Sequence, residues 1–248
     1  MSDILSWIRV EGPFLIAHRG FARDARENTP LAFEAALEAG ADGVELDVRI
    51  TADGVPVVHH DSSATTETGG EVSLETASWE EVSGTAFSEG GRRYRVPRLD
   101  RVLEDLTGRC LVNVEVKPVD RSRRNAAVAE VYRVAERVRP RESLLISSFD
   151  PALLEGFWRM DRALLLGYLF SDLDAFNHLD EHAVVDGLTA LHPRHDLVDG
   201  KFMRRAAERG LQVHAWTADD PGEIARLVEL GVTGVITNRA DGGLGTLA

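Results

Sequence analysis

Short apolar runs rich in β-branched residues recur along the chain, and segments with the helical spacing of apolar positions separate most of them. The predicted strands are Phe14–His18, Gly43–Val48, Cys110–Val116, Leu144–Ser148, Ala163–Tyr168, Gly187–Leu191, Leu211–Trp216 and Gly234–Thr237. The predicted helices are Pro30–Ala39, Leu99–Leu106, Arg123–Val138, Pro151–Met160, Leu173–His178, Gly200–Glu208 and Pro221–Leu230. Strands that alternate with helices through short connections predict parallel strands joined by right-handed crossovers. Eight such units in 248 residues favour an α/β fold, a closed (β/α)8 TIM barrel, over an open doubly wound sheet.

The segment from Thr51 to Arg95 does not follow this pattern. It holds a short predicted strand at Val55–His59, a polar stretch rich in Ser, Thr and Gly, and a helical turn at Trp79–Val82. A connection of this length is too long for a simple strand-to-helix loop. We interpret residues 51–95 as an insertion after the second strand that covers the mouth of the barrel. The whole chain, residues 1–248, is then expected to form a single domain.

Composition and charge narrow the classes of partner. Hydrophobic residues make up 44% of the chain, as in folded globular proteins and unlike disordered ones. The 28 Lys and Arg residues against 41 Asp and Glu give a formal net charge of −13, which disfavours nucleic-acid binding. A phosphate group would also be repelled at long range. Any phosphate site must therefore be built locally, from cationic side chains or a metal.

Other sequence features bear on the compartment. The longest apolar run, Ala163–Phe170, is far too short to span a membrane, and the first residues lack the features of a targeting segment. Cys110 is the single cysteine, so no intramolecular disulfide is possible, and its apolar neighbours predict a buried strand residue rather than a nucleophile. We expect a cytoplasmic protein without a stable membrane anchor.

Charged side chains gather at the ends of the first three predicted barrel strands, where barrels of this type carry their active sites. They are His18 and Arg19 after the first strand, Glu45 and Asp47 on the second, and Glu115 and Lys117 on the third. Within the second and the third strand the two charged residues are spaced i, i+2, which places both side chains on one face. We expect all of them to face one site.

Three carboxylates inside apolar runs require positive charge close by. A hard divalent cation with oxygen ligands, Mg²⁺ or Ca²⁺, would supply it at Glu45, Asp47 and Glu115. The alternative is a purely structural salt-bridge network in which Arg19, Lys117 and Arg49 neutralise the carboxylates.

Two histidines add acid–base capacity to this cluster. His18 closes the first strand, and His60 follows the short strand of the insertion. Either histidine alone is compatible with a structural role, but beside a carboxylate cluster the pair indicates proton transfer. Arg19 is suited to binding a phosphate through two hydrogen bonds, and Lys117 can neutralise it as a point charge. Together these residues predict phosphoester chemistry.

The motifs that hold these residues occur in a characteristic order. They are His18-Arg19-Gly20, Glu27-Asn28-Thr29, Gly40 to Val48, Thr51-Ala52-Asp53-Gly54, Val57 to Asp61, Pro97-Arg98-Leu99, Glu115-Val116-Lys117-Pro118, Ser147-Ser148-Phe149, Ala215-Trp216-Thr217 and Gly234 to Asn238. The chain resembles the glycerophosphodiester phosphodiesterase family, in its bacterial cytoplasmic type, and the match covers nearly the whole sequence. The chain departs from the family pattern at Ala64, Thr66 and Glu67, and at Asp219, where the family often has asparagine.

The resemblance assigns a role to each matching residue. It implies that Glu45, Asp47 and Glu115 bind one divalent cation, that His18 and His60 are the acid–base pair, that Arg19 and Lys117 contact the phosphate, and that Trp216 packs on the substrate. Ordinary packing at the barrel rim is an equal alternative for Trp216. Glu27 and Asn28 match a turn that supports the site, and His59 is interpreted as structural because adjacent strand positions point in opposite directions.

The resemblance also implies the reaction. A small-molecule glycerophosphodiester would be hydrolysed to glycerol 3-phosphate and an alcohol, with His18 as general base and His60 as general acid. The attacking group would be a hydroxyl of the substrate glycerol or a water molecule. Alternatives are a lysophospholipase D or a cyclising phospholipase-like lyase acting on a lipid phosphodiester, a non-catalytic phosphodiester-binding regulator, and a sugar-phosphate isomerase on the same fold.

Overall fold

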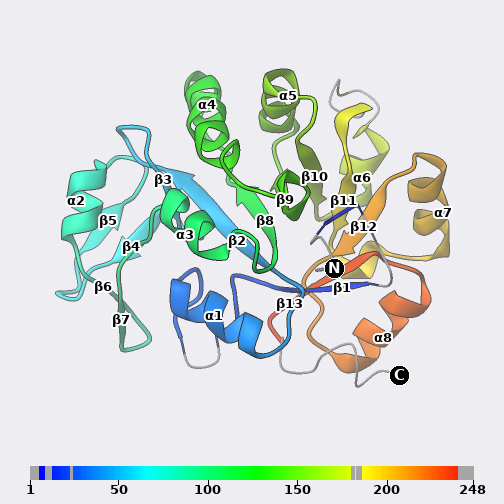
Figure 1. Cartoon of the computed structure of the whole chain (residues 1–248), viewed down its shortest axis with the longest axis horizontal. Coiled ribbons are helices and arrows are strands. Elements are labelled where there is room, and N and C mark those ends of the chain that lie inside the picture. The colour runs from blue at the N-terminus through cyan, green and yellow to red at the C-terminus, as the bar shows by residue number, and fades with distance from the viewer. Residues whose placement is uncertain (1–5, 9–12, 23–24, 180–181, 183–185, 240–248) are drawn as a thin grey trace.

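Eight parallel strands close into a barrel in the computed structural model, which describes residues 6–8, 13–22, 25–179, 182 and 186–239 (Figure 1). In order around the barrel they are β1 (Phe14–Ala17), β2 (Gly43–Ile50), β8 (Leu111–Val116), β9 (Leu144–Ser148), β10 (Leu165–Phe170), β11 (Ala190–Pro193), β12 (Gln212–Ala215) and β13 (Gly234–Thr237). Strand β1 pairs with β13 on one side and with β2 on the other, which closes the sheet. The predicted (β/α)8 TIM barrel is confirmed.

Helices surround this barrel on its outside (Figure 1). They are α1 (Pro30–Glu38), α3 (Leu99–Leu106), α4 (Arg124–Ala135), α5 (Pro151–Met160), α6 (Leu173–Asn177), α7 (Gly200–Glu208) and α8 (Pro221–Glu229), with 3-10 turns at Arg121–Arg123, Arg141–Ser143 and His195–Leu197. Side chains of Thr29, Asp150, Asp172, Asp199 and Asp220 accept hydrogen bonds from the first turns of their helices. These caps satisfy backbone donors that would otherwise lack partners, so local sequence fixes where each of these helices begins.

Two predicted strands, the fifth and the sixth, are displaced along the chain from the observed ones, whereas the other six agree within two residues at each end. The fifth was expected at Ala163–Tyr168 and the sixth at Gly187–Leu191, whereas β10 and β11 begin two and three residues later. Both strands extend further because their last residues, Phe170 and Pro193, pair with each other at the carboxyl end of the sheet. Element ends depend on such pairing between distant segments, which an apolar run alone does not reveal.

Trp7 closes the amino-terminal end of the barrel. Its side chain is fully buried against an apolar cluster of residues from five strands: Ile16, Leu111, Leu145, Ala190 and Ile236. The indole N–H donates to the carbonyl of Ser143 at 3.0 Å, and the Gln212 amide donates to the Trp7 carbonyl at 2.7 Å. Trp7 is thereby fixed to the 3-10 turn before β9 and to β12, both in the second half of the chain.

Two histidines, His192 on β11 and His214 on β12, are fully buried inside the barrel. Their rings contact each other at 3.1 Å between Nε2 of His192 and Nδ1 of His214. A Cβ atom on Gly167 would lie 2.6 Å from the ring of His192, and one on Gly234 would lie 2.9 Å from the ring of His214. These glycines leave the space that the two rings occupy. Burial lowers the pKa of His214 to about 3 and the pKa of His192 well below its usual value. Both rings are therefore neutral near pH 7.

The expected insertion lies between β2 and α3. Strand β3 (Pro56–Val58) pairs antiparallel with the end of β2, and helix α2 (Trp79–Gly84) begins with a capping box of Ser78 and Glu81. The polar stretches form two hairpins that the sequence did not predict: β4 (Ser63–Thr65) with β5 (Glu71–Ser73), and β6 (Phe87–Glu89) with β7 (Arg92–Tyr94). An apolar cluster of their own supports them, formed by Val57, Ala64, Leu74, Val82, Phe87 and Val96.

The insertion extends to one side of the barrel (Figure 1). Of the described residues that line the pocket at the barrel mouth, only His60 comes from residues 51–95. His60 is thus the one described side chain of this segment that reaches the pocket. The hairpins pack on their own apolar cluster, which holds them beside the mouth.

Cys110 is buried, and burial raises the pKa of its thiol to about 12, so it is inert as a nucleophile at neutral pH. None of the helices in the described part of the chain has the length and apolarity needed to cross a membrane. The first five residues, which entered the expectation about targeting, lie outside the described residues.

Candidate active site

A cavity of about 180 Å³ opens at the carboxyl ends of the barrel strands. Its lining consists of His18, Arg19, Glu45, His60, Glu115, Lys117, Phe149, Leu169, Trp216, Thr217 and Ile236. Seven of the eight predicted site residues are among them. The eighth, Asp47, is fully buried and is bound to Arg19 and Lys117. The cavity lining thus combines charged side chains with apolar ones.

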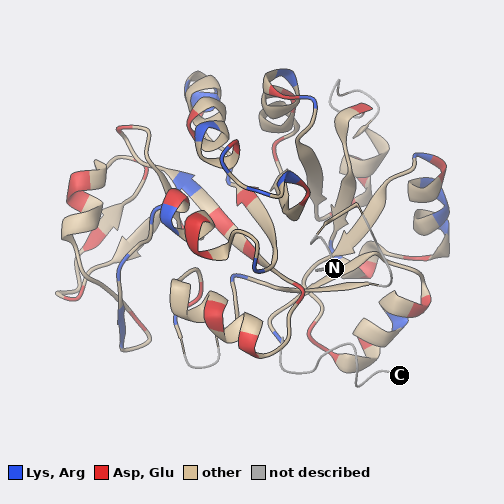
Figure 2. Ribbon diagram, in the orientation of Figure 1, with Lys and Arg blue, Asp and Glu red and all other residues tan. Residues whose placement is uncertain are grey.

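The three predicted metal ligands lie together. One carboxylate oxygen from each of Glu45, Asp47 and Glu115 lies within 4.8 Å of the others, and all three residues are buried. They come from neighbouring strands, because β2 and β8 pair with Asp47 directly opposite Glu115. Figure 2 shows these acidic positions as red bands on β2 and β8, among barrel strands that are mostly tan.

Two cationic side chains hold this acidic cluster. Lys117 Nζ lies 2.6 Å from Asp47 Oδ1 and 2.5 Å from Glu115 Oε1. Arg19 Nε lies 3.1 Å from Asp47 Oδ2, while its backbone N–H donates to Glu45 Oε2 at 3.0 Å. Part of the salt-bridge network that was the alternative to a metal therefore exists. Arg49 takes no part in it, since its guanidinium binds Glu75 and the His60 carbonyl instead.

The backbone after β1 bends sharply to bring Arg19 into this position. Arg19 and Gly20 both have positive φ angles, 55° and 78°. A Cβ atom on Gly20 would lie 2.7 Å from the backbone carbon of Ala32, so only glycine fits between this turn and α1. The strained turn places the Arg19 N–H and its guanidinium on two different carboxylates.

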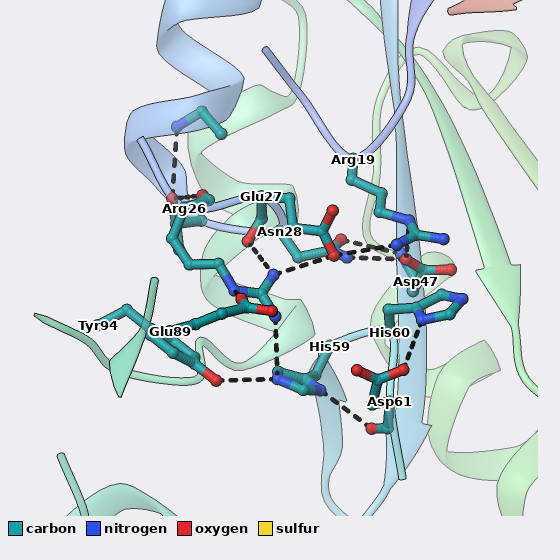
Figure 3. A network of polar contacts seen from close by, with 12 residues as sticks. Arg19, Arg26, Glu27, Asn28, Asp47, His59, His60, Asp61, Glu89 and Tyr94 are labelled. Carbon is teal, nitrogen blue, oxygen red and sulfur yellow. Dashed lines mark hydrogen bonds and ion pairs between the residues drawn. The ribbon is translucent and has the colours of Figure 1, made fainter. Parts of the chain in front are cut away.

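Glu27 and Asn28 support the site, as the sequence predicts. Asn28 also has a positive φ, 57°, and its amide is bonded to Asp47 twice. Nδ2 of Asn28 donates to Asp47 Oδ2 at 2.7 Å, and the Asp47 N–H donates to Asn28 Oδ1 at 3.1 Å (Figure 3). Glu27 accepts from Arg19 Nη1 at 3.0 Å. The turn thereby fixes both a carboxylate and the arginine beside it.

The carboxylates in the cluster differ in their pKa values. Burial raises the pKa of Glu45 well above its usual value, and the nearby carboxylates of Asp47 and Glu115 raise it further. Burial also raises the pKa of Glu115, with Lys117 opposing it. At Asp47 burial acts in the same direction, but Lys117 and Arg19 outweigh it and lower the pKa to about 2. The cluster therefore carries more carboxylate charge than its two cations alone stabilise.

The two predicted catalytic histidines have different partners. His18 Nδ1 lies 2.8 Å from Oδ1 of Asn238, and His60 Nδ1 lies 2.8 Å from Oδ1 of Asp61. Burial, followed by the charge of Arg19, lowers the pKa of His18, so its ring is neutral at pH 7. His18 thus has a neutral partner, whereas His60 has an anionic one.

His59 lies outside the cavity, in agreement with its structural interpretation. Its Nδ1 lies 3.0 Å from the Asp61 carbonyl and its Nε2 lies 3.1 Å from the Tyr94 hydroxyl (Figure 3). Arg26 packs its guanidinium over the Tyr94 ring and forms ion pairs with Glu27 and Glu89. These contacts join the β6–β7 hairpin to the two loops that carry Arg19 and His60.

Phe149 and Asn238 lie in motifs that the sequence singles out, but the sequence assigned no role to either of them. Phe149 lines the cavity and contacts the edge of Trp216 at 5.5 Å between ring centroids, and Asn238 binds His18. Both directly follow a barrel strand, β9 and β13, so the rule that located the charged residues would also have found them. Trp216 is further fixed by its indole N–H, which donates to the His192 carbonyl at 2.7 Å.

A sequence model of the Glycerophosphoryl diester phosphodiesterase family matches residues 18–242. The chain belongs to this family. It is 33% identical over 236 residues to a glycerophosphodiester phosphodiesterase from Caldanaerobacter subterraneus, with 90% of this chain and 93% of that protein covered. The chain is therefore an enzyme of a phosphodiester hydrolase family, as the sequence predicts.

Solved structures of glycerophosphodiester phosphodiesterases share the fold. A putative glycerophosphoryl diester phosphodiesterase from Silicibacter pomeroyi superposes with a TM-score of 0.81 at 27% identity and covers 92% of this chain and 90% of its own. A phosphodiesterase from Oleispira antarctica, solved in complex with the product sn-glycerol-3-phosphate, superposes with a TM-score of 0.80 at 24% identity and covers 95% and 96% of the two chains. Both support the barrel architecture of this phosphodiesterase.

The acidic cluster of this phosphodiesterase, formed by Glu45, Asp47 and Glu115, fits a divalent cation. Oε1 of Glu45 is buried and has no hydrogen-bond partner among the described residues. A buried carboxylate oxygen without a donor is costly, and a cation would satisfy it. The donors are all carboxylate oxygens, which suit a hard ion such as Mg²⁺ or Ca²⁺.

Proposed function

We propose that this enzyme hydrolyses small, water-soluble glycerophosphodiesters to glycerol 3-phosphate and an alcohol. One observation supports this most directly: a single cavity is lined by two carboxylates of the acidic cluster, two cations and two histidines. Phosphodiester hydrolysis needs a bound anion, stabilisation of charge on phosphoryl oxygens, and proton transfer to and from oxygen. We further propose that the chain acts as one domain over residues 1–248 and works in the cytoplasm.

Arg19 and Lys117 would bind the phosphodiester. Both line the cavity. Lys117 Nζ has one N–H beyond those directed at Asp47 and Glu115, and the Arg19 guanidinium has N–H groups beyond those directed at Asp47 and Glu27. The apolar side chains of Phe149, Leu169 and Trp216 line the same cavity and would pack against the carbon atoms of glycerol. A substrate with a charged centre and an apolar flank is thereby oriented in the pocket.

Glu45, Asp47 and Glu115 would hold one divalent cation, Mg²⁺ or Ca²⁺, at this site. When bound, such an ion polarises a phosphoryl oxygen and lowers the pKa of a hydroxyl or water beside it. The raised pKa values of Glu45 and Glu115 are consistent with carboxylates that need additional positive charge.

His18 would act as the general base and His60 as the general acid. His18 is a neutral ring whose Nε2 can accept the proton of the attacking hydroxyl or water. His60 has the carboxylate of Asp61 at 2.8 Å, which stabilises the ring when it carries the proton that the departing alkoxide needs. Loss of either group would leave one proton transfer without a partner.

The test compares substrates and variants in one assay. Protein stripped of metal is incubated with glycerophosphocholine, with and without Mg²⁺ or Ca²⁺, and released glycerol 3-phosphate is measured. We expect metal-dependent release. His18→Gln and His60→Gln should each reduce kcat by about 100-fold or more while the fold is retained. His195→Gln is the matched control, because His195 binds Glu223 outside the cavity. Normal turnover by the His18 or His60 variant would contradict the assigned roles.

A second substrate separates this reaction from its nearest alternative. Lysophosphatidylcholine presents the same phosphodiester with an acyl chain. Release of choline from lysophosphatidylcholine, without release of choline from glycerophosphocholine, would identify a lysophospholipase D. A cyclic phosphate product would identify a lyase. Inactivity on both substrates with every metal would refute the proposed hydrolysis.

A further inference from the structure

The polar contacts of His18 continue away from the cavity to Asp219. Asn238 follows β13, and its Oδ1 lies 2.8 Å from His18 Nδ1. Its Nδ2 donates to Asp219 Oδ2 at 2.8 Å. Asp219 lies in the loop between β12 and α8, so this chain of contacts joins three separate parts of the barrel mouth.

The hydrogen-bonding chemistry of Asp219 fixes which way the Asn238 amide faces. An ionised carboxylate only accepts hydrogen bonds. The amide atom that faces Asp219 must therefore be the NH₂ group, and the atom that faces His18 must be the carbonyl oxygen. The reverse orientation of the amide would place its carbonyl oxygen against a carboxylate oxygen, two acceptors with no proton between them.

Other donors keep Asp219 in this role. The Asn238 backbone N–H donates to Asp219 Oδ1 at 2.8 Å, and the Thr237 hydroxyl donates to the same oxygen at 3.0 Å. Burial raises the pKa of Asp219, but the hydrogen bonds from Asn238 and Thr237 outweigh it and lower the pKa. Asp219 is thus ionised at neutral pH, with both oxygens accepting.

The orientation of Asn238 decides the tautomer of His18. Because Oδ1 of Asn238 can only accept, the neutral imidazole must carry its proton on Nδ1. Its Nε2 then has a free lone pair. With the opposite amide orientation, the proton would move to Nε2, and that atom could no longer accept another.

We propose that Asp219 is a positioning residue that, through Asn238, holds His18 in the tautomer required of a general base. The proposal rests on the role of His18 in the proposed function. Neither Asp219 nor Asn238 is among the residues that line the cavity. Asp219 acts through the orientation of an amide and not by touching the substrate.

The decisive variant is Asp219→Asn, which changes one oxygen to an NH₂ group at nearly constant size. The remaining oxygen is drawn to the Asn238 N–H and the Thr237 hydroxyl, so the new NH₂ group faces the Asn238 side chain. Asn238 must then turn its oxygen toward residue 219 and its NH₂ group toward His18. The His18 proton is expected to shift to Nε2.

The measurement is the tautomer of His18, read from two-bond ¹H–¹⁵N correlations of ¹⁵N-histidine-labelled full-length protein with Mg²⁺ present and no substrate. The signals of His18 are assigned by their loss in His18→Gln. We expect the Nδ1–H pattern in the unmodified protein and the Nε2–H pattern in Asp219→Asn. Asp220→Asn is the matched control. It removes an equal charge one residue away, and the Asp220 side chain caps α8.

A reciprocal exchange supplies the rescue. In the double variant Asp219→Asn with Asn238→Asp, the NH₂ group of residue 219 donates to one oxygen of residue 238, and the other oxygen accepts from His18. The Nδ1–H pattern should return. With glycerophosphocholine, Asp219→Asn should reduce kcat by about 10- to 100-fold with little change in KM, the range typical of residues that orient a histidine.

The outcomes separate this proposal from the proposed function. An Nε2–H pattern in the unmodified protein, or an unchanged pattern in Asp219→Asn, overturns the proposal whatever the activity. The expected tautomers in a protein that does not cleave glycerophosphocholine would support the proposal and refute the proposed reaction. If Asp219→Asn does not fold, as judged by circular dichroism, the patterns of the unmodified protein and the double variant still decide.

Discussion

Lys117 lies between two buried carboxylates, and its removal provides a sharp test of the charge balance in the site. It is one of two lysines in a chain with 26 arginines. Its ammonium contacts Asp47 at 2.6 Å and Glu115 at 2.5 Å. Lys117→Met keeps most of the side-chain volume and removes only the charge.

The burial of these groups sets the magnitude. The side chains of Lys117, Asp47 and Glu115 are 11%, 1% and 8% exposed, so this is a buried ion cluster and not a surface salt bridge. Removing one partner of a buried pair leaves an uncompensated charge and typically costs about 3–5 kcal/mol. Domains are stable by only about 5–15 kcal/mol in total. The loss would therefore be a large fraction of the free energy of unfolding.

The assay is urea unfolding of metal-free protein. Lys117→Met should lose about 3–5 kcal/mol of unfolding free energy. Lys201→Met is the matched control, since Lys201 is exposed on α7, and its unfolding midpoint should not change. The same measurement with Mg²⁺ or Ca²⁺ should restore stability to the Lys117 variant, by about 2.7 kcal/mol at a concentration 100 times its Kd.

Two results would refute this reasoning. If Lys117→Met is as stable as Lys201→Met in the presence of a chelator, the carboxylates are not held by the lysine. If neither Mg²⁺ nor Ca²⁺ stabilises the Lys117 variant, the carboxylate cluster does not bind a divalent cation with useful affinity.

Three further predictions concern stability and pH. Gly20→Ala should lower the free energy of urea unfolding by about 2–5 kcal/mol, because φ is positive and the new Cβ atom would lie 2.7 Å from the backbone of Ala32. Gly40→Ala, where φ is +88° but the surrounding space is open, should lower it by only about 1–2 kcal/mol. Equal losses would contradict the predicted clash. Trp7→Ala should lower the free energy of unfolding by about 3–5 kcal/mol, because a fully buried indole is removed. A loss smaller than about 1 kcal/mol would show that the amino-terminal end of the barrel closes without it. The pKa of His214 is about 3 in the folded state and about 6.5 in the unfolded state, so between these pH values only the unfolded state gains a proton. This group should therefore lower the free energy of unfolding by about 1.4 kcal/mol for each pH unit below 6.5. His214→Gln should therefore show a shallower loss of stability on acidification, and an identical slope would contradict the assignment.

Much of the barrel could be predicted from the sequence because its strands are buried on both faces. Such strands appear as continuous apolar runs, and helix caps such as Asp150 and Asp220 mark where helices begin. The β4–β5 and β6–β7 hairpins were missed because their strands are three residues long and largely polar. Their stability comes from the apolar cluster they share with Val57 and Leu74, which no local pattern shows.

The residues of the site could be predicted because each charged side chain interrupts an apolar run at a strand end. Their pairing could not, because it depends on register between strands. The contact of Lys117 with Asp47 requires β2 and β8 to align with Asp47 opposite Glu115. The contact of His18 with Asn238 joins the first barrel strand to the last. Such contacts follow from pairing between strands that are distant in sequence and are invisible in any short window of sequence.

Closure of the barrel between β1 and β13 also has a consequence for synthesis on the ribosome. His18 and Asn238 are 220 residues apart, and β1 has no neighbour on one side until β13 has been made. At about 5–20 residues per second, β1 waits roughly 10–45 s for that neighbour. During this interval the nascent chain has an unpaired apolar edge of the kind that recruits other strands. Synthesis through Asn238 is thus required both to seal the sheet and to complete the surroundings of His18, so a translation product truncated before β13 would lack both at once.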